Sequence, residues 1–341
     1  MKHTLPEGYL VRPARMDDAG AIVEMWNAWS NHTLGADKFT LQETQADWST
    51  PGFDLSNDTR LVTAPGGEIA GYYEVWDIDE PHVRLHCWGL IHPEHTNLGI
   101  GSLLLAWAEE RARQALDKAP AEVRVVLLAH GLSKEEAAMQ LFRDAGFEFI
   151  RHSLRMVIRM NGQPPAAEWP KGITVRPMIV GKEERAVVHA IRDTFQDHWG
   201  YVESPFETEF EQWKHYMEND ESYDPTLWFL AMDGEKIAGI SLCRSEAYDD
   251  PEMGWVRTLG VRRPWRRRGI GLALLAHSFR AFHQLGKRKV GLGVDAKSLT
   301  GAKRLYEKAG MRSDPEHQYS IYEKELRPGV DLSLQTLDTK E

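Results

Sequence analysis

Two copies of one pattern fill this 341-residue chain, and they limit its fold more than any other feature. Residues 9–13 (YLVRP) recur as residues 173–177 (ITVRP). Residues 92–101 (HPEHTNLGIG) align without a gap with residues 262–271 (RRPWRRRGIG). The distance between the copies is far too long for a solenoid of short repeats. The sequence therefore predicts two domains of one kind, which suits a chain of this length.

Strand and helix patterns follow the same order in both copies. Apolar residues alternate in the expected strands, and glycines end the expected helices. In the first copy, Ser133 and Glu136 are spaced as a capping box that opens a helix ending before Gly146. The matched expectations are helices at 19–29 and 183–195, strands at 68–75 and 235–242, strands at 86–91 and 256–261, helices from 100 and 269, strands at 123–129 and 289–295, and a last helix ended by Gly146 or Gly310.

A segment rich in proline and glycine, residues 161–172 (NGQPPAAEWPKG), separates the copies and has no periodicity. Such a composition is typical of a linker. We therefore expect an N-terminal domain at 8–160, a C-terminal domain at 173–327 and a polar tail at 328–341.

Charge and cysteine content exclude several classes of protein. The formal net charge is −10, which opposes general binding to nucleic acids or anionic membranes. Only two cysteines occur, Cys87 and Cys243, so neither a disulfide framework nor a zinc quartet can be formed. The first residues lack the apolar core of a secretion signal, and no run of eighteen apolar residues occurs. We expect a cytoplasmic protein without nucleic-acid or membrane partners.

Positive charge is concentrated in one loop, residues 266–271 (RRRGIG), which follows an expected strand and opens an expected helix. The first turn of a helix leaves four N–H groups without partners and carries partial positive charge, so a phosphate satisfies both. Two glycines remove the Cβ atoms that would hold a phosphate away. The guanidinium groups can add charge-assisted hydrogen bonds. The expected diphosphate site comprises Arg266, Arg267, Arg268, Gly269, Ile270 and Gly271.

Two known phosphate-binding patterns do not fit this loop. The P-loop pattern G-x-x-x-x-G-K-[ST] is absent, and Leu274 stands where a dinucleotide fingerprint needs its third glycine. The loop instead resembles the acetyl-CoA signature [QR]-x-x-G-x-[GA] of the GNAT acetyltransferases. Residues 298–311 (SLTGAKRLYEKAGM) resemble the second block of that family, N-x-x-x-A-x-x-L-Y-x-x-x-G-[FM], with Ser298 in place of the asparagine.

This resemblance covers both copies and implies a tandem GNAT protein similar in arrangement to mycothiol synthase-type proteins. It implies an α/β fold of the α+β type. Each domain would have a mixed, mostly antiparallel sheet flanked by helices, with one strand splayed to bind the cofactor. It further implies an acyl-CoA-dependent N-acyltransferase. Acetyl-CoA would be the co-substrate, no metal would be needed, and the acetyl group would pass directly to a primary amine of a small molecule or peptide.

By the same resemblance, the second copy carries the catalytic residues. Leu259, Gly260 and Val261 would offer backbone groups to the pantetheine arm, and Tyr306 occupies the position of the general acid that protonates the CoA thiolate. A phenol suits this role because its usual pKa, about 10, keeps it protonated at neutral pH. The alternative is that Tyr306 only packs, as Phe142 would at the matching position of the first copy.

The general base is expected among the acidic residues that precede the splayed strand, with Glu252 as the first choice. A carboxylate there could reach the amine directly or through a water. The alternative is a solvated acidic loop, and many members of the family need no dedicated base. The candidates considered are Glu246, Asp249, Asp250 and Glu252.

The first copy lacks the charges of the second. Its loop has Thr96 in place of Arg266 and Leu98 in place of Arg268, although both glycines remain. We expect a degenerate domain that supports the second, while a phosphate site made only of backbone groups stays open. That site would comprise Ile91, Asn97, Leu98, Gly99, Ile100 and Gly101.

Other groupings are less specific. Four histidines near one strand have no metal-ligand spacing, and Cys243 is most simply a small apolar residue. Aromatic residues crowd positions 199–228, where they could line an acceptor pocket or seal the contact between the copies. The histidines are His82, His86, His92 and His95, and the aromatics are Trp199, Tyr201, Phe206, Trp213, Tyr216, Tyr223 and Trp228.

One alternative function belongs to another class: a CoA-binding or sensor protein in which neither copy transfers an acetyl group. Tyr306 argues against it, and thiol release from acetyl-CoA with a panel of amines would separate the two. The identity of the amine and the oligomeric state are not readable from the sequence.

Overall fold

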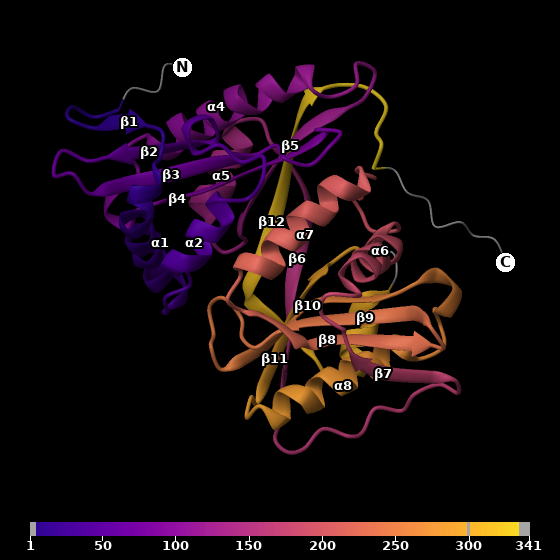
Figure 1. Cartoon of the computed structure of the whole chain (residues 1–341). Helices are drawn as coiled ribbons and strands as arrows, with labels where there is room; N and C mark the ends of the chain where they lie inside the picture. Colours follow the sequence, from indigo (N-terminus) through magenta and orange to yellow (C-terminus); the bar gives the residue numbers. More distant parts are fainter. Residues whose placement is uncertain (1–4, 299–300, 334–341) are drawn as a thin grey trace. The chain divides into compact units, whose positions relative to one another are not determined.

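The computed structural model describes residues 5–298 and 301–333. Within them the chain divides into two compact units, each described here by itself (Figure 1). The first unit contains residues 5–151, 204–221 and 319–332, and the second contains residues 152–203, 222–298, 301–318 and 333. Each unit is therefore built from more than one segment of the chain.

Six strands form the sheet of the first unit, in the order β1-β2-β3-β4-β5-β12. In the described ladders of this sheet, β4 and β5 pair in parallel and the other described pairs are antiparallel. The elements are β1 (Leu10–Arg12), α1 (Ala19–Leu34), α2 (Leu41–Trp48), α3 (Leu55–Asp58), β2 (Thr59–Thr63), β3 (Ile69–Trp76), β4 (Arg84–Ile91), α4 (Ile100–Arg113), β5 (Val125–Leu132), α5 (Glu136–Asp144), α7 (Phe206–Asn219) and β12 (Arg312–Arg327).

The sheet of the second unit repeats this plan in the order β6-β11-β10-β9-β8-β7. Among its described ladders, β10 and β11 are the parallel pair, and the rest are antiparallel. The elements are β6 (Glu148–Arg159), β7 (Ile173–Pro177), α6 (Glu184–Phe195), β8 (Tyr223–Asp233), β9 (Lys236–Arg244), β10 (Met253–Val261), α8 (Ile270–Gln284), β11 (Lys289–Asp295) and α9 (Ala302–Lys308). The expected α/β fold, with mixed and mostly antiparallel strand pairing flanked by helices, is confirmed.

The last strand of each sheet comes from the other copy of the repeat. Strand β6 precedes the expected linker, yet it pairs with β11 in the second unit from Lys289↔Arg159 to Asp295↔Ser153. Strand β12 ends the second copy, yet it pairs with β5 in the first unit, starting at Tyr319↔Leu132. The compact units thus differ from the contiguous halves that the repeat outlines.

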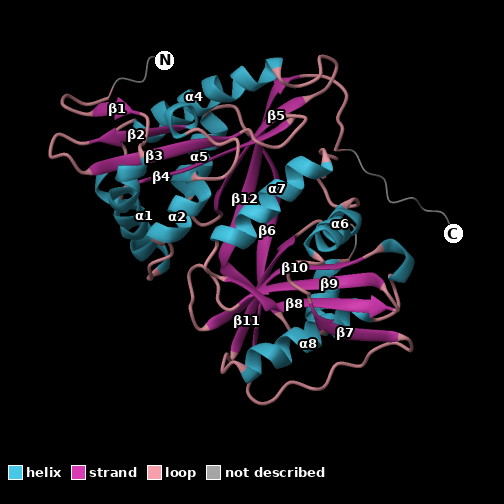
Figure 2. Cartoon of the chain, in the orientation of Figure 1, coloured by secondary structure: helices cyan, strands magenta, loops and turns pink. Residues whose placement is uncertain are grey.

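Helices cover both faces of each sheet (Figures 1 and 2). In the first unit α4 lies on one face and α1 and α2 lie on the other. In the second unit α8 lies on one face and α6 on the other. The apolar side chains between these layers form a core in each unit; its members include Ile22, Trp26, Leu61 and Tyr72 in the first unit and Val256, Leu274, Phe282 and Val290 in the second.

The repeated VRP segment makes the same local contact in both units. Arg12 donates two hydrogen bonds of 2.6 Å to Asp18, where the first helical turn begins. Arg176 donates bonds of 2.7 and 2.6 Å to Glu183, directly before α6. A planar guanidinium bound to both oxygens of a carboxylate fixes the angle at which the strand enters the helix. The repeat is therefore present in the side-chain contacts as well as in the amino-acid sequence.

One predicted local feature is wrong. Ser133 and Glu136 do not form a capping box, because α5 has Glu135 at its N-cap and no capping hydrogen bond from a side chain. The Ser133 hydroxyl instead bonds the hydroxyl of Ser320 on β12, at 2.8 Å. A partner far away in the sequence thus replaces the local one. Part of the expected helix at 298–311, residues 299–300, lies outside the described residues, and α9 is described from Ala302.

Among the described helices, none is both long and apolar enough to cross a membrane.

Candidate functional site

The site of the second unit begins where β10 and β11 separate. Their parallel ladder runs from Met253↔Lys289 to Val256↔Leu292 and ends there, although both strands continue. On its other side β10 pairs with β9 through a register shift at Arg257. A bulge of this kind bends the strand and turns its backbone groups away from the regular ladder. The result is an opening at the middle of the sheet, as expected for the splayed strand.

The three backbone positions expected to bind the cofactor arm lie on the part of β10 that still pairs with β9 but no longer pairs with β11. Leu259 lines the opening. Gly260 is required by packing, because a Cβ there would come within 2.5 Å of the Thr194 hydroxyl. The carbonyl oxygen of Val261 accepts a hydrogen bond from Nε of Arg266, at 3.0 Å. Each of these backbone positions therefore has a distinct environment.

The loop before α8 has the backbone geometry of an anion site. Gly269 is in the left-handed region at φ 86°, and Arg267 is there too, at φ 62°. The first hydrogen bond of the helix is donated by Ala273 to the Gly269 carbonyl, at 3.0 Å. Within the part of the chain that the structure describes, the N–H groups of residues 267–272 donate to no protein atom. They are available to a ligand.

The three arginines of this loop differ in what they contact. Arg266 is held by the protein: it donates to Asp197, to Val261 and, at 3.2 Å, to the Thr194 carbonyl. Arg267 and Arg268 are exposed, and neither forms an ion pair with a described residue. The sequence gives no sign of this difference. Arg266 is the member of the loop that fixes its shape, whereas the other two can turn toward a diphosphate.

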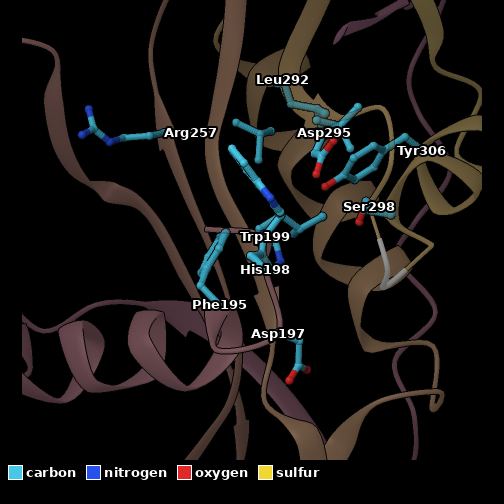
Figure 3. A pocket seen from close by; sticks show the side chains of 14 residues that line it. Phe195, Asp197, His198, Trp199, Arg257, Leu292, Asp295, Ser298 and Tyr306 are labelled. Atoms are coloured by element: carbon cyan, nitrogen blue, oxygen red, sulfur yellow. The ribbon is translucent and has the colours of Figure 1, made fainter. Parts of the chain in front are cut away.

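A cavity of about 130 Å³ lies at the opening between β10 and β11 (Figure 3). Its walls come from the segment after α6, from the two separating strands and from α9. Figure 3 shows Arg257 and Asp197 pointing away from the other labelled side chains. The lining side chains that carry polar groups and are considered below are those of His198, Trp199, Asp295, Ser298 and Tyr306.

Tyr306 stands on α9 and is 7% exposed. Burial raises the pKa of its phenol to about 12, so the hydroxyl is protonated at neutral pH. That hydroxyl makes no hydrogen bond to any residue within 5–298 or 301–333, although its side chain lines the cavity. A protonated donor without a protein partner is suited to act on a ligand in the cavity.

Ser298, expected at the family's asparagine position, also lines the cavity. Its backbone N–H donates to the carbonyl of Asp295, at 3.1 Å, which forms a turn at the end of β11. The cofactor role of Ser298 and of the loop residues stays a prediction.

Glu252 lies outside the cavity. It is exposed in the turn before β10, and its N–H donates to the carboxylate of Asp250, at 3.0 Å. The next residue, Met253, is paired with the first residue of β11, whereas the cavity is lined by β11 residues from Leu292 onward. Glu252 as the base stays a prediction, and the structure brings other proton acceptors to the cavity.

The neighbouring acidic candidates have partners of their own. Asp249 accepts two hydrogen bonds of 2.8 Å from Arg155 and lies 3.0 Å from His317. Asp250 forms an ion pair with Lys289 at 2.6 Å. These carboxylates are held in ion pairs beside the strands.

The aromatic residues at 199–228 divide between several places. Trp199 lines the cavity. Helix α7 carries Phe206, Trp213 and Tyr216 and belongs to the first unit, where Gln212 donates to Asp79 at 3.1 Å. Tyr223 and Trp228 pack edge to face on β8. Of the two interpretations of this cluster, the cavity wall applies to Trp199.

The first unit reproduces the loop but neither the bulged strand nor the phenol. Asn97 and Gly99 are left-handed at φ 60° and 78°, and Leu103 donates the first helical bond to Gly99 at 3.0 Å. Strand β4, however, pairs with β3 in six consecutive pairs and has no register shift over them. Phe142 is 4% exposed and packs against Tyr322 of β12. The backbone anion geometry is therefore present without the bulge or the phenol.

Two histidines occupy cavity positions in the first unit. His86 pairs with Leu128 of β5 as Val256 pairs with Leu292 of β11, and His130 then corresponds to Val294. Their rings lie 6.1 Å apart, and burial lowers the pKa of both, that of His86 to about 3. They are neutral at pH 7 and replace the aliphatic wall of the second unit.

The remaining sequence candidates have ordinary structural roles. The ring of His82 hydrogen-bonds Asp77 at 2.9 Å, and that of His95 hydrogen-bonds Tyr9 at 2.9 Å. Both cysteines are buried, and burial raises the pKa of each thiol, that of Cys243 to about 11. In the described part of the chain no group of three or more metal-ligating side chains is assembled.

Comparison with known proteins identifies relatives for both copies. The model of the acetyltransferase (GNAT) family matches residues 22–147 and 188–311. A solved GCN5-related N-acetyltransferase from Sphaerobacter thermophilus is 36% identical, with a TM-score of 0.78, and the match covers 97% of this chain and 100% of that one.

Two other relatives have the tandem arrangement or a more specific name. A mycothiol acetyltransferase from Saccharopolyspora erythraea is 26% identical over 272 residues, which cover 79% of this chain and 84% of that protein. A solved tandem GNAT protein from the clavulanic acid biosynthesis pathway is 14% identical and shares the fold, with a TM-score of 0.68 over 94% of this chain and 99% of that one.

Proposed function

Because the chain belongs to the GNAT family of acetyltransferases, we propose that its second unit transfers the acetyl group of acetyl-CoA directly to a primary amine of a small molecule or peptide. The family uses acetyl-CoA, and an acetyltransferase of this kind needs an amine-bearing acceptor. We propose that the second unit is the active one, that the residues named below act in it, and that the acceptor is a primary amine of this kind.

The observation that carries it is the protonated Tyr306 hydroxyl in the cavity at the opening of β10 and β11. Amine attack on the thioester creates an oxyanion and then a thiolate. Backbone N–H groups on the part of β10 that no longer pairs with β11 can stabilise the oxyanion, and Tyr306 can protonate the thiolate. The first unit has a phenylalanine at that position and an unbroken β4 ladder.

The cofactor is proposed to enter with its diphosphate on the free N–H groups of residues 267–272 and its arm along Leu259. Arg267 and Arg268 would add positive charge, and Arg266 would keep the loop in shape. The first unit has the same backbone groups at residues 97–102 without the arginines, so it would bind acetyl-CoA weakly or without turnover.

A small amine is the acceptor class to test first. Relatives of this chain bear the name mycothiol acetyltransferase. The experiment mixes the purified protein with acetyl-CoA and a panel of amines, and it follows CoA thiol release together with the mass of the acetylated product. We expect release that depends on one class of amine. Tight binding of acetyl-CoA without transfer to any amine would support the CoA-binding or sensor alternative instead.

A further inference from the structure

The short segment that follows α6 is fixed at both its backbone and its side chains. The N–H of His198 donates to the carbonyl of Phe195, at 2.8 Å, and the N–H of Tyr201 donates to His198, at 3.1 Å. The rings of Phe195 and His198 lie with their centroids 4.3 Å apart. Asp197, between them, is tied to Arg263 and Arg266 of the cofactor loop. The position of His198 is therefore set by a rigid support.

The imidazole of His198 lines the same cavity as Tyr306 (Figure 3). Neither ring nitrogen hydrogen-bonds any residue in the described ranges, 5–298 and 301–333. A neutral imidazole then presents one N–H and one lone pair to whatever occupies the cavity.

Both carboxylates that line the cavity accept hydrogen bonds from the protein. That of Asp197 accepts from two guanidinium groups and points away from the other labelled side chains. That of Asp295 accepts the backbone N–H of Lys297, at 2.9 Å. Among these three side chains, His198 is the one whose proton-accepting atoms form no hydrogen bond to a described residue.

The charges around His198 keep its ring neutral. Burial lowers its pKa below the usual value, and the positive charge of Arg266 lowers it further. Asp197 and Asp295 act in the opposite direction but do not reverse the shift. Tyr306, on the opposite wall, is uncharged at neutral pH because burial raises its pKa to about 12. At pH 7 the lone pair is therefore available.

We propose that His198 is the general base of acetyl transfer, an inference that rests on the proposed function. Its free ring nitrogen takes a proton from the acceptor nitrogen as that nitrogen forms a bond to the thioester carbon, directly or through one water. The C–S bond then breaks, and the leaving thiolate takes the proton of Tyr306. The phenolate regains a proton from solvent, and the imidazolium releases its proton to solvent. From the neutral amine the sum is one amide and one CoA thiol with no net proton, and an acceptor in the ammonium form first gives one proton to solvent.

His198 and Glu252 make opposite predictions, because the glutamate lies exposed before β10 and outside the cavity. The test compares His198→Phe, which keeps a ring against Phe195 but removes both nitrogens, with Glu252→Gln. His189→Phe is the matched control, since His189 is an exposed histidine on α6. His198→Ala leaves space at this position, so that imidazole added to the solution can take the place of the missing side chain.

Single-turnover acetyl transfer is measured with the best amine of the panel between pH 5 and 9, together with acetyl-CoA affinity by calorimetry. We expect His198→Phe to lower the rate constant by about 100-fold or more, with affinity unchanged within twofold, and to lose the rise in rate on the acidic side. Imidazole should restore part of the rate of His198→Ala, while His189→Phe should match the parent.

A His198→Phe variant as fast as an active parent would overturn this inference alone. So would a variant whose rate and acetyl-CoA affinity fall together without imidazole rescue, or loss of the acidic limb in Glu252→Gln and not in His198→Phe. A parent that acetylates no amine would instead overturn the proposed function, and the assignment of His198 with it.

Discussion

The carboxylate of Asp197, which is 3% exposed, accepts a hydrogen bond from the guanidinium of Arg266 in the loop before α8. Arg263 donates to the same carboxylate. Burial would raise the pKa of this carboxyl, but the two arginines outweigh burial and hold the pKa below its usual value. The ion pair therefore connects the shape of the loop with the segment that carries His198.

Replacing Asp197 by Asn should lower the free energy of unfolding by roughly 1–3 kcal/mol, because two hydrogen bonds to a charged acceptor are weakened. Since the pKa of Asp197 is lower in the native state, the ionised carboxylate stabilises the fold fully above the usual carboxyl pKa, about 4. This stabilisation is lost as the pH falls below that value and through the native pKa. Urea denaturation of parent and variant at pH 3 to 8 measures this.

Asp193→Asn is the matched control for this variant. Asp193 lies on α6, directly before the segment that carries Asp197, and pairs with Arg262 at 2.6 Å, but both side chains are about one third exposed. An exposed pair of this kind contributes about 0–1 kcal/mol. Equal losses in the two variants would contradict the role given to Asp197.

Gly271→Val and Gly101→Val test which unit binds acetyl-CoA. A Cβ at either position would come 3.2 Å from a leucine side chain, Leu305 or Leu141, so the packing disturbance is alike. We expect Gly271→Val to abolish the tight site in calorimetry and Gly101→Val to leave it within about twofold. A tight site that responds only to Gly101→Val would reverse the assignment of the units.

Tyr306→Phe should lower single-turnover acetyl transfer by about 100-fold or more, since it removes a general acid. Acetyl-CoA binding should weaken by no more than about 1 kcal/mol, because the ring and its packing remain. A loss confined to acetyl-CoA affinity would make Tyr306 a binding residue. An unchanged rate would mean that the thiolate is protonated by water or by the amine.

Glu74→Gln should change how the stability of the first unit depends on pH. Glu74 is 7% exposed and accepts from Tyr72 at 2.6 Å and from Trp76 at 2.7 Å. Burial nevertheless raises its pKa to about 7. Between about pH 4.5 and 7 the native state keeps a proton on Glu74 that the unfolded state has lost. The free energy of unfolding therefore falls as the pH rises through this range.

The glutamine variant lacks this titration and should gain up to about 3 kcal/mol relative to the parent between pH 4 and pH 8. Denaturation curves followed by tryptophan fluorescence measure the difference. Glu110→Gln, on the exposed side of α4, should keep the slope of the parent. A constant difference between Glu74→Gln and parent at every pH would mean that Glu74 is ionised throughout.

Local backbone features were predictable from the sequence because their causes are local. Gly269 and Gly310 stand at left-handed positions, φ 86° and 91°, that any other residue would adopt under strain. The alternation of residues 289–295 matches β11. The repeat also predicted the same order of strands and helices in both copies, and the two halves of the strand order follow one plan.

Contacts between distant residues were not predictable in this way. Arg266 looks like a phosphate ligand in the sequence, and only its position beside Asp197, 69 residues earlier, shows that it is already paired. Ser133 likewise bonds Ser320 and does not form the capping box that its spacing from Glu136 predicted. His198 comes from a segment without periodicity, so the pattern of the chain did not identify it as a cavity residue, whereas Trp199 was among the aromatics that could line a pocket.

Strand β12 has a consequence for how this protein is made. A ribosome releases the chain from its N-terminus, and β12, which completes the first sheet, emerges after every other described strand of both sheets. Until then β5 has an open edge, which can pair with other chains. A gene cut at residues 161–172 would encode one fragment without its sixth strand and another without β6. During translation the first sheet therefore gains its sixth strand only after all six strands of the second sheet have been made.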